Sequence, residues 1–286
     1  MSVFYFFVLK PCLCGILLLP RAIYKEIKMK SAIYRMLSAT LVSVIIIYAM
    51  GMCVSAAAYE CWYIKRNGNN RPSFPASAEN MREYNCYFID DNLDDSNKRI
   101  YITFDAGYEN GNVEKILDIL KEENVPAAFF VLDNIILKNT DLVRRMSDEG
   151  HLVCNHTKNH KNLSSAGRET ISADLSALED IYRSKTGKEM SKYFRFPEGK
   201  YSIDALKCIY ELGYKTIFWS FAYDDWDNSR QMSSERAIDK VMANTHNGAV
   251  MLFHPTSTTN VKIFSTLIQR WRDEGYEFGT LDELTK

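Results

Sequence analysis

The chain of 286 residues lacks an excess of charge of either sign. It contains 35 basic and 36 acidic residues, which give a formal net charge of -1. Proteins that bind nucleic acids through the phosphates need a basic surface, so the composition argues against a nucleic-acid partner. Hydrophobic residues make up 47% and charged residues 25%. Both values are typical of globular proteins and exclude a disordered or low-complexity chain.

The sequence also lacks the glycine-rich motifs that bind nucleotides. No G-x-G-x-x-G opens the first expected helix of the globular part, and no G-x-x-x-x-G-K occurs. Because these motifs form the backbone cradle for phosphates, we expect no nucleotide partner. The seven cysteines show no spacing typical of a metal knuckle. We expect the four that follow residue 58 to be free thiols or to form at most one disulfide bond: Cys61, Cys86, Cys154 and Cys208.

Charged residues are absent from positions 36–58. An apolar run of this length is sufficient to cross a bilayer. Three basic residues precede it, and Ala56-Ala57-Ala58 resembles the cleavage site of a signal peptide. The sequence therefore predicts a signal peptide or membrane anchor over residues 1–58, with Met29 as an alternative start. The rest of the chain is then expected outside the cytoplasm, anchored to the membrane or secreted.

Residues 59–97 are polar, contain Pro72 and Pro75, and end in an acidic stretch. No apolar period runs through them, which predicts a linker. The globular domain is expected over residues 98–286, a length typical of one domain.

Short apolar runs and amphipathic segments alternate through the expected domain. The expected strands cover residues 100–104, 127–132, 152–154, 193–196, 215–221, 249–253 and 276–279. The expected helices cover residues 112–124, 141–149, 168–186, 203–212, 233–245 and 258–273. About seven β-α units in series indicate parallel strands with right-handed crossovers. We therefore predict an α/β fold, and we favour a distorted (β/α) barrel over a doubly wound sheet.

Polar side chains of several chemical types follow five of these strands. In a barrel, functional residues gather beyond the carboxyl ends of the strands. Three of the five histidines are among them. The sequence therefore predicts that six residues meet in one groove: Asp105, His156, His160, Arg195, Asp225 and His254.

The residue types indicate hydrolytic chemistry. The four-residue spacing of His156 and His160 would place both rings on one face of a helical turn, where they chelate a divalent metal. Burial at a strand end would raise the pKa of Asp105 unless Arg195 supplies a neighbouring positive charge. A carboxylate such as that of Asp225 would fix the tautomer of His254 and raise its pKa, as a general acid requires.

Five ordered motifs resemble those of the polysaccharide deacetylases, carbohydrate esterase family four. They are Thr103-Phe104-Asp105-Ala106-Gly107, His156-Thr157-Lys158-Asn159-His160, Arg195-Phe196-Pro197-Glu198-Gly199, Asp225-Trp226 and Leu252-Phe253-His254. The resemblance covers about residues 98–284 and implies a distorted (β/α) barrel. The longer first motif, F-D-A-G-Y-E-N-G, is most similar to that of the delta-lactam-biosynthetic muramic acid de-N-acetylases of spore-forming bacteria.

The resemblance implies a role for each residue. Asp105 resembles the catalytic base, Arg195 the residue that positions it, and His254 the general acid. Asp225 resembles the carboxylate that tunes this acid, and His156 and His160 resemble the metal ligands. Expected contacts with substrate come from Tyr108, Tyr201, Trp226 and Leu252, with the Tyr201 backbone N–H beside the oxyanion.

The sequence departs from the family pattern at Ala106, where most members have an acidic third metal ligand. The muramic acid branch is similar in lacking an acid at this position. Two imidazoles alone make a weak metal site, so water, substrate or Asp105 would complete it. Zn²⁺ suits imidazole ligands best, whereas Mg²⁺ would need more oxygen ligands.

The resemblance implies a deacetylase that acts on peptidoglycan glycan strands in the cell wall or spore cortex. The expected substrate is peptide-free N-acetylmuramic acid, whose free amine then closes to the delta-lactam. One alternative is a deacetylase for N-acetylglucosamine, chitin-like polymers or xylan esters. Another is a catalytically inactive glycan-binding protein, which only Ala106 supports.

Overall fold

The computed structural model describes residues 21–51, 59–94 and 96–286. It divides into two compact units, residues 1–55 and 56–286. The described part of the first unit is helix α1 (Arg21–Gly51). Among the described residues, none of the helices has the length and hydropathy of a membrane span. Much of the expected leader and its cleavage site lies outside the described residues, so both remain predictions.

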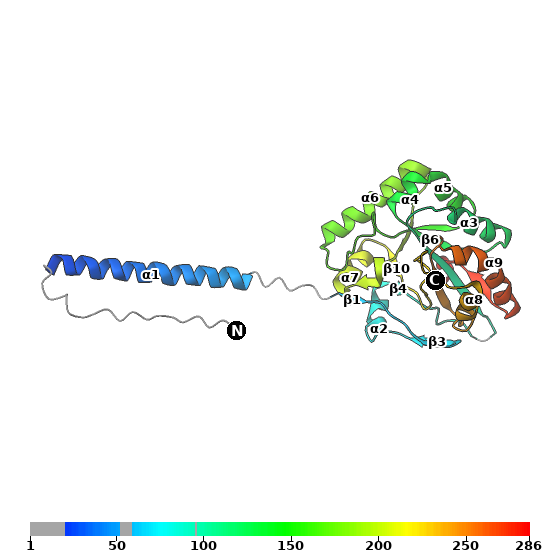
Figure 1. The fold of residues 1–286 in the computed structure, drawn as a ribbon, viewed down its shortest axis with the longest axis horizontal. Helices are drawn as coiled ribbons and strands as arrows, with labels where there is room; N and C mark the ends of the chain where they lie inside the picture. Colours follow the sequence, from blue (N-terminus) through cyan, green and yellow to red (C-terminus); the bar gives the residue numbers. More distant parts are fainter. Residues whose placement is uncertain (1–20, 52–58, 95) are drawn as a thin grey trace. The chain divides into compact units, whose positions relative to one another are not determined.

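A parallel sheet bent into a distorted barrel forms the centre of the second unit (Figure 1). Neighbouring strands are all parallel. The strand order is β11 (Ala249–Phe253), β5 (Arg99–Ala106), β6 (Ala128–Val131), β7 (Leu152–Asn155), β8 (Ser191–Phe194), β10 (Lys215–Ile217) and β4 (Cys86–Tyr87). Strand β12 (Glu277–Gly279) pairs with the beginning of β5. This arrangement confirms the predicted barrel with parallel strands.

The two ends of the strand order meet only through isolated bridges in the described residues. Ile89, just after β4, bridges to Ala249, and Phe221, beyond β10, bridges to Met251. The backbone N–H of Leu252 donates to the carbonyl oxygen of Phe221 over 2.9 Å. The barrel is therefore least regular beside β11, the strand that leads to His254.

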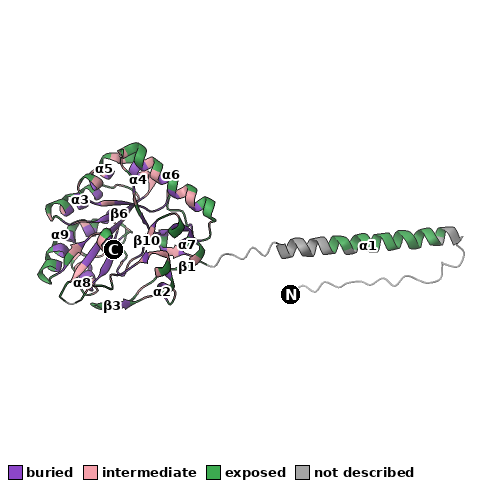
Figure 2. Cartoon of the chain, turned by 180° about the vertical axis from the view of Figure 1, so that it is seen from behind, coloured by how far each residue is buried: buried purple, intermediate pink, exposed green. Residues whose placement is uncertain are grey.

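Helices cover the outside of the barrel (Figure 2), with buried residues facing the strands and exposed residues facing outward. They are α3 (Val113–Glu122), α4 (Asp133–Lys138), α5 (Thr140–Asp148), α6 (Arg168–Thr186), α7 (Ile203–Glu211), α8 (Ser234–Met242), α9 (Thr258–Asp273) and α10 (Leu281–Leu284). Helices α6 and α9 and strand β11 have the predicted bounds. Helices α4 and α10 were not predicted, because six and four residues are too short to show a helical period.

Residues 59–97 are not a linker, contrary to the prediction. They form β1 (Glu60–Cys61), β2 (Lys65–Asn67), β3 (Asn70–Ser73), α2 (Ala78–Met81), a 3-10 turn (Arg82–Tyr84) and β4, a strand of the main sheet. Trp62 is buried, and its ring centroid lies 4.8 Å from those of Phe88 and Phe218. The buried side chains of this segment are few and irregularly spaced. No apolar period therefore marked it as part of the domain.

Two short elements connect this segment to the rest of the domain. Strand β9 (Lys200–Tyr201) follows a 3-10 turn (Pro197–Gly199) and pairs antiparallel with β1.

All four cysteines that follow residue 58 are free thiols, in agreement with the expectation.

Candidate active site

A cleft of about 690 Å³ opens where β5, β7 and β11 end. Its size lies in the usual range for ligand sites. It is lined by Asp105, Gly107, Tyr108, Leu132, His156, His160, Glu198, Trp226, His254 and Thr256. Four of the six residues predicted to converge therefore line one cleft. The other two, Arg195 and Asp225, are buried and bond to lining residues.

Arg195 holds the carboxylate of Asp105 at one side of the cleft. The guanidinium is fully buried, and its Nη1 donates to Asp105 Oδ1 over 2.9 Å. Three further bonds fix it, from Nη2 to Thr103 Oγ1 (2.9 Å) and to the carbonyl oxygen of Phe218 (3.3 Å), and from Nε to the carbonyl oxygen of Ile217 (3.0 Å). Burial by itself would raise the pKa of Asp105, but its interactions with His156, Arg195 and His254 lower it overall, and of these Arg195 carries a permanent charge. The ionised carboxylate can therefore accept a proton.

His156 lies beside this carboxylate. Its Nδ1 is 2.9 Å from the carbonyl oxygen of Arg195, which assigns the proton to Nδ1. Its Nε2 is then free and lies 3.5 Å from Asp105 Oδ2. Burial lowers the pKa of His156 to about 4. The ring is therefore neutral at physiological pH, as a metal ligand must be.

His160 is close to His156, but not through a helical turn as predicted. The two ring centroids lie 5.1 Å apart, with the ring planes at 72°. Thr157 and His160 both have left-handed backbones, with φ of 69° and 60°. Side chains stabilise the turn, because Asn155 Oδ1 accepts from the N–H of Thr157 and Thr157 Oγ1 accepts from the N–H of Lys161, each over 3.0 Å. These local bonds replace helical ones.

The donor atoms of this corner fit a metal ion in part. Within the described residues, no three His, Cys, Asp or Glu side chains are arranged to hold a metal ion. Ala106, beside the base, is fully buried and offers no ligand atom. His156 does fit, because its Nε2 is free and a backbone carbonyl fixes its other nitrogen. His160 and Asp105 are the nearest further donors.

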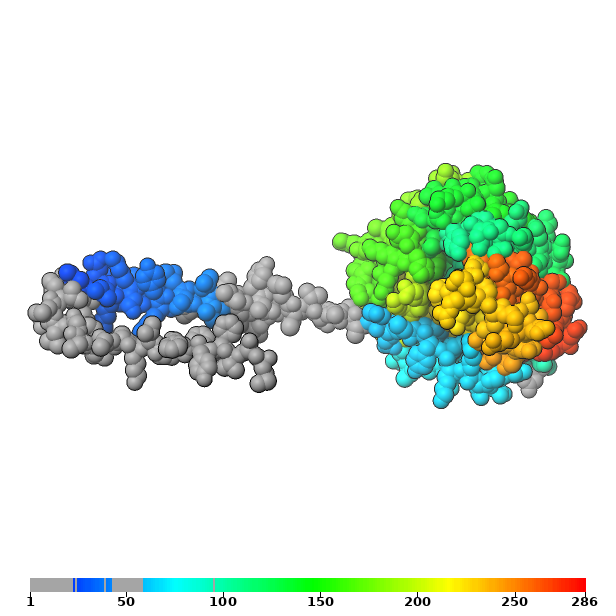
Figure 3. Space-filling view, in the orientation of Figure 1, coloured from blue at the N-terminus to red at the C-terminus, as the bar shows by residue number. Residues whose placement is uncertain are grey.

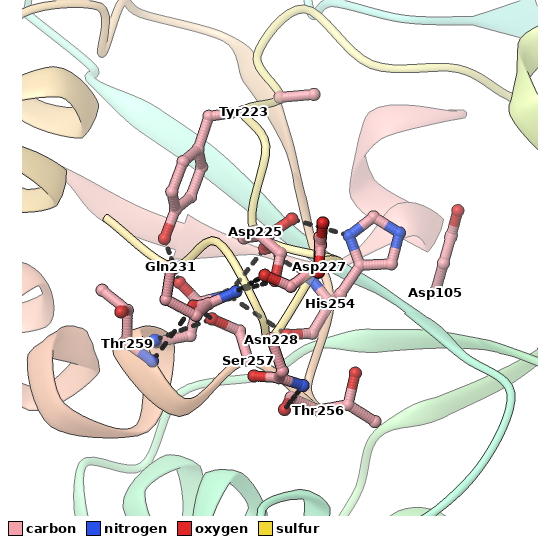
Figure 4. A network of polar contacts seen from close by, with 12 residues as sticks. Asp105, Tyr223, Asp225, Asp227, Asn228, Gln231, His254, Thr256, Ser257 and Thr259 are labelled. Atoms are coloured by element: carbon pink, nitrogen blue, oxygen red, sulfur yellow. Dashed lines mark hydrogen bonds and ion pairs between the residues drawn. The ribbon is translucent and has the colours of Figure 1, made fainter. Parts of the chain in front are cut away.

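Asp225 and His254 form a second pair in the cleft (Figure 4), in which the imidazole lies between Asp225 and Asp105. His254 Nδ1 is 2.7 Å from Asp225 Oδ1, and the backbone N–H of His254 donates to Oδ2 over 2.8 Å. Burial lowers the pKa of His254, but the charge of Asp225 and its hydrogen bond outweigh burial and raise it above the ordinary value. This pair therefore favours a protonated imidazole.

Asn260 is part of this arrangement and was missed by the sequence reasoning. Its side chain is fully buried on α9, and its Nδ2 donates to Asp225 Oδ2 over 2.6 Å and to the carbonyl oxygen of His254 over 3.1 Å. The hydroxyl of Tyr223 donates to Asn260 Oδ1, which fixes the direction of the amide. A polar residue at a core position of the expected helix 258–273 was the available signal.

The expected substrate residues divide into two groups. Tyr108 and Trp226 line the cleft and are 47% and 61% exposed. Tyr201 and Leu252 are buried and do not line it. The hydroxyl of Tyr201 bonds to Glu60 in the segment that was expected to be a linker, and the role expected for the Tyr201 backbone N–H stays a prediction. The sequence reasoning also missed Gly107, Leu132, Glu198 and Thr256 in the lining.

Comparison with known proteins agrees with this geometry. Residues 92–217 match the family model described as polysaccharide deacetylase. The peptidoglycan-N-acetylmuramic acid deacetylase PdaA of Bacillus subtilis is 35% identical over 226 residues, which are 78% of this chain and 84% of PdaA. The chain belongs to the polysaccharide deacetylase family. This membership confirms the predicted resemblance to the family.

Solved structures of this deacetylase family have the same fold. The structure of Bacillus subtilis PdaA, a family 4 carbohydrate esterase, has a TM-score of 0.75 at 32% identity and covers 80% of this chain and 97% of its own. A family 4 carbohydrate esterase from Bacillus anthracis has a TM-score of 0.65 with the same identity and coverage. This deacetylase is therefore a hydrolase of amide bonds, in a family that in general depends on metal ions.

Proposed function

We propose that this polysaccharide deacetylase removes the acetyl group from N-acetylmuramic acid in peptidoglycan, outside the cytoplasm. The preferred substrate is a muramic acid unit that carries no stem peptide. The freed amine of this sugar closes onto its lactyl carboxylate to give the delta-lactam of spore cortex. The observation that carries the proposal is the placement in one cleft of a carboxylate held by Arg195, Asp105, and an imidazole held by Asp225, His254. The similarity to PdaA supports muramic acid as the sugar.

Asp105 acts as the general base. Its carboxylate takes a proton from the water that attacks the acetamide carbonyl. Of the two carboxylate oxygens of Asp105, Arg195 donates to Oδ1. The other oxygen, Oδ2, is therefore available to bind this water on the side of His156. The four bonds of the buried guanidinium keep the carboxylate in place during the reaction.

His254 acts as the general acid. Since Asp225 holds the Nδ1 proton, the proton on Nε2 is the one available to the leaving amine. Asp225 and Asn260 stabilise the imidazolium in one orientation before the reaction and after each turnover. Base and acid thus lie on separate strand ends, with separate partners that hold opposite protonation states.

A divalent cation, for which we propose Zn²⁺, would be held by His156 and His160, with water or substrate in the position left open at Ala106. When bound, it supplies polarisation of the acetyl carbonyl and stabilisation of the oxyanion. The exposed rings of Tyr108 and Trp226 supply apolar faces for the sugar. Residues 1–58 remain proposed as a leader that takes this domain out of the cytoplasm.

The test is incubation of the full chain with spore-type glycan strands in which muramic acid carries no stem peptide. Mass analysis of the fragments should show the loss of acetyl, and the further loss of water where the lactam closes. Chitooligosaccharides serve as the competing substrate. Faster acetate release from chitooligosaccharides would contradict the choice of sugar, and no release from either would favour a glycan-binding protein.

The Asp105→Asn variant tests the base. We expect kcat for acetate release to fall about 10²- to 10⁴-fold, the usual contribution of a positioned base. The matched variant is Asp204→Asn, which changes a carboxylate at the start of α7, outside the cleft lining. It should retain the wild-type rate. An Asp105→Asn variant that folds and keeps the wild-type kcat would contradict the assignment.

A further inference from the structure

A second cavity of about 460 Å³ adjoins the catalytic cleft. Trp226 lines both, so its exposed ring lies at the boundary between the two. The second cavity contains two arginines, Arg230 and Arg236, at its rim. The loop and helix that carry them follow β10 and form part of the yellow to gold surface on the visible face of the domain (Figure 3).

The guanidinium groups of Arg230 and Arg236 have no hydrogen bond or ion pair with any residue that the structure describes. Most arginines of the second unit do form ion pairs. These are Arg71, Arg82, Arg99, Arg144, Arg145, Arg168, Arg183, Arg195 and Arg272. Arg66 donates to the carbonyl oxygen of Ala222. Arg230 and Arg236 are both exposed, so one cavity presents two guanidinium groups that are open to solvent.

The acidic residues of the cavity form no ion pair with these arginines, although the charge of Arg230, after the hydrogen bonds from Ser229, contributes to lowering the pKa of Asp227. Asp227 Oδ1 already accepts from the backbone N–H (2.9 Å) and the hydroxyl (2.6 Å) of Ser229. Within the described residues, no ion pair joins Asp224 to Arg230 or Arg236. Its carboxylate therefore lies more than 4 Å from both guanidinium groups. The guanidinium groups of Arg230 and Arg236 thus remain available to bind a ligand from solution.

The loop beneath the cavity is held in place. Gln231 Nε2 donates to the carbonyl oxygens of Asp225 (2.8 Å) and Asp227 (3.0 Å), and Gln231 Oε1 accepts from the hydroxyl of Ser257. Asn228 Nδ2 donates to the carbonyl oxygen of Thr256 over 2.9 Å. These bonds tie the loop to the elements that carry the Asp225–His254 pair. A ligand in the cavity would therefore bind at a fixed position relative to the general acid.

We propose that Arg230 and Arg236 form a carboxylate-binding subsite for the glycan strand, next to the catalytic cleft. The planar guanidinium matches a carboxylate with two parallel hydrogen bonds. The strand of the proposed substrate carries carboxylates on the lactyl groups of muramic acid and at the ends of stem peptides. While one sugar of the glycan occupies the cleft, the ring of Trp226 contacts the next part of the glycan. The two arginines then bind a carboxylate further along the same glycan strand. This subsite rests on the proposed function.

The test compares Arg230→Ala/Arg236→Ala with Arg270→Ala in the full chain. Arg270 is an exposed arginine on α9 that likewise has no side-chain partner among the described residues, and it lines neither cavity. We measure KM and kcat on peptide-free glycan strands, on the same strands with amidated carboxyl groups, and on strands that keep their stem peptides. We expect the double variant to raise KM about tenfold on strands with free carboxylates, since one bond to a charged group is worth about that factor. Arg270→Ala should keep the wild-type KM.

Amidated strands should show no difference between wild type and the double variant. A tenfold effect on peptide-free strands identifies the lactyl group as the source of the carboxylate, and an effect confined to strands with stem peptides identifies the peptide. The proposal is wrong if KM is unchanged on every strand, if amidation does not remove the difference, or if Arg270→Ala has the same effect. It is also wrong if soluble poly(glycerol phosphate) binds the wild type more tightly than these strands and loses affinity in the double variant. Binding of each strand to Asp105→Asn, with and without the two substitutions, gives an independent readout. This binding measurement tests the arginine subsite even if the enzyme deacetylates a sugar other than muramic acid.

Discussion

Two carboxylates at the active site have different surroundings and therefore different tasks. Asp105 contacts a fully buried guanidinium and faces the cleft, so it stays ionised and free to take a proton. Asp225 is buried away from the cleft lining, and its oxygens accept bonds from His254 and Asn260. These surroundings support our proposal that the first carboxylate reacts and that the second holds the imidazole that reacts. Residue identity alone does not separate the two roles, whereas their partners do.

Replacing Asp225 with Asn should change the pH dependence of the reaction. The carboxylate raises the pKa of His254, and the acid must be protonated, so activity is lost as pH rises through that pKa. Without the negative charge the pKa falls, and the alkaline limb of the kcat profile should move about one to two pH units lower. The measurement is acetate release between pH 5 and 10, with Asp204→Asn, which lines neither cavity, as control. An unmoved alkaline limb would assign the acid to another group.

A histidine outside the active site should limit stability in acid. His151 is buried, and neither ring nitrogen has a hydrogen-bond partner among the described residues. Burial lowers its pKa from the ordinary 6.5 to about 4. Between these values the unfolded chain binds a proton that the folded chain does not, so stability is lost as pH falls from 6.5 towards 4.

The variant His151→Phe should remove this loss, because the ring packs against Phe129 at 5.5 Å and needs no charge. We expect the free energy of unfolding of the wild type to fall by up to about 3 kcal/mol more than that of the variant between pH 7 and pH 4. Urea titrations at the two pH values measure the difference. Parallel losses in both proteins would show that His151 is not responsible.

At the scale of elements, the segment 59–94 bonds to loops that carry residues of the active site. The backbone N–H of Trp62 donates to the carbonyl oxygen of Gly199 over 2.8 Å, and its indole Nε1 donates to the carbonyl oxygen of Trp219 over 2.9 Å. Gly199 closes the motif that begins with Arg195, and Trp219 lies on the segment between β10 and Asp225. This segment therefore braces two of the loops that carry polar site residues.

Trp62→Ala should consequently destabilise the whole domain. Removing a buried Trp costs about 3–5 kcal/mol, whereas truncating the adjacent exposed Tyr63 should cost less than about 0.5 kcal/mol. Urea unfolding midpoints of the two variants and the wild type test this contrast. Equal midpoints for all three proteins would mean that the segment contributes little to stability.

Sequence patterns predicted the elements that repeat a regular period and missed those that do not. Helix α6 was predictable because Ile171, Leu175, Leu178 and Tyr182 are spaced to bury one stripe. Segment 59–94 was not predictable, because single aromatic residues such as Trp62 anchor it by contacts distant in sequence. At the site, the rule that the carboxyl ends of parallel strands meet correctly predicted that Asp105, His156, His160 and His254 line one cleft. Asn260 lies within a helix and Tyr201 turns away, and only tertiary contacts decide such positions.

At the scale of the molecule, the catalytic unit begins well before the five motifs. The compact unit spans residues 56–286, and β4 occupies one end of the strand order. The family model, by contrast, matches only residues 92–217. The unit that folds is thus larger, at both ends, than the region that the family model matches.

A chain that starts at Tyr59 should therefore fold and deacetylate as the full chain does, whereas one that starts at Lys98 should fail to fold cooperatively. The shorter chain lacks β4 and the buried side chains of Trp62 and Phe88. Thermal unfolding followed by circular dichroism, together with acetate release, tests both chains. A cooperative transition in the chain that starts at Lys98 would restore the linker interpretation.

The place of β4 also sets the order in which the barrel can form during synthesis. Cys86 of β4 pairs with Thr216 of β10, and Ile89 bridges to Ala249, so the first barrel strand to leave the ribosome finds its neighbours only near the end of translation. Contacts between such distant positions slow folding and leave apolar surface exposed meanwhile. The nascent domain thus has an early aromatic segment that a chaperone can hold until the last strands arrive.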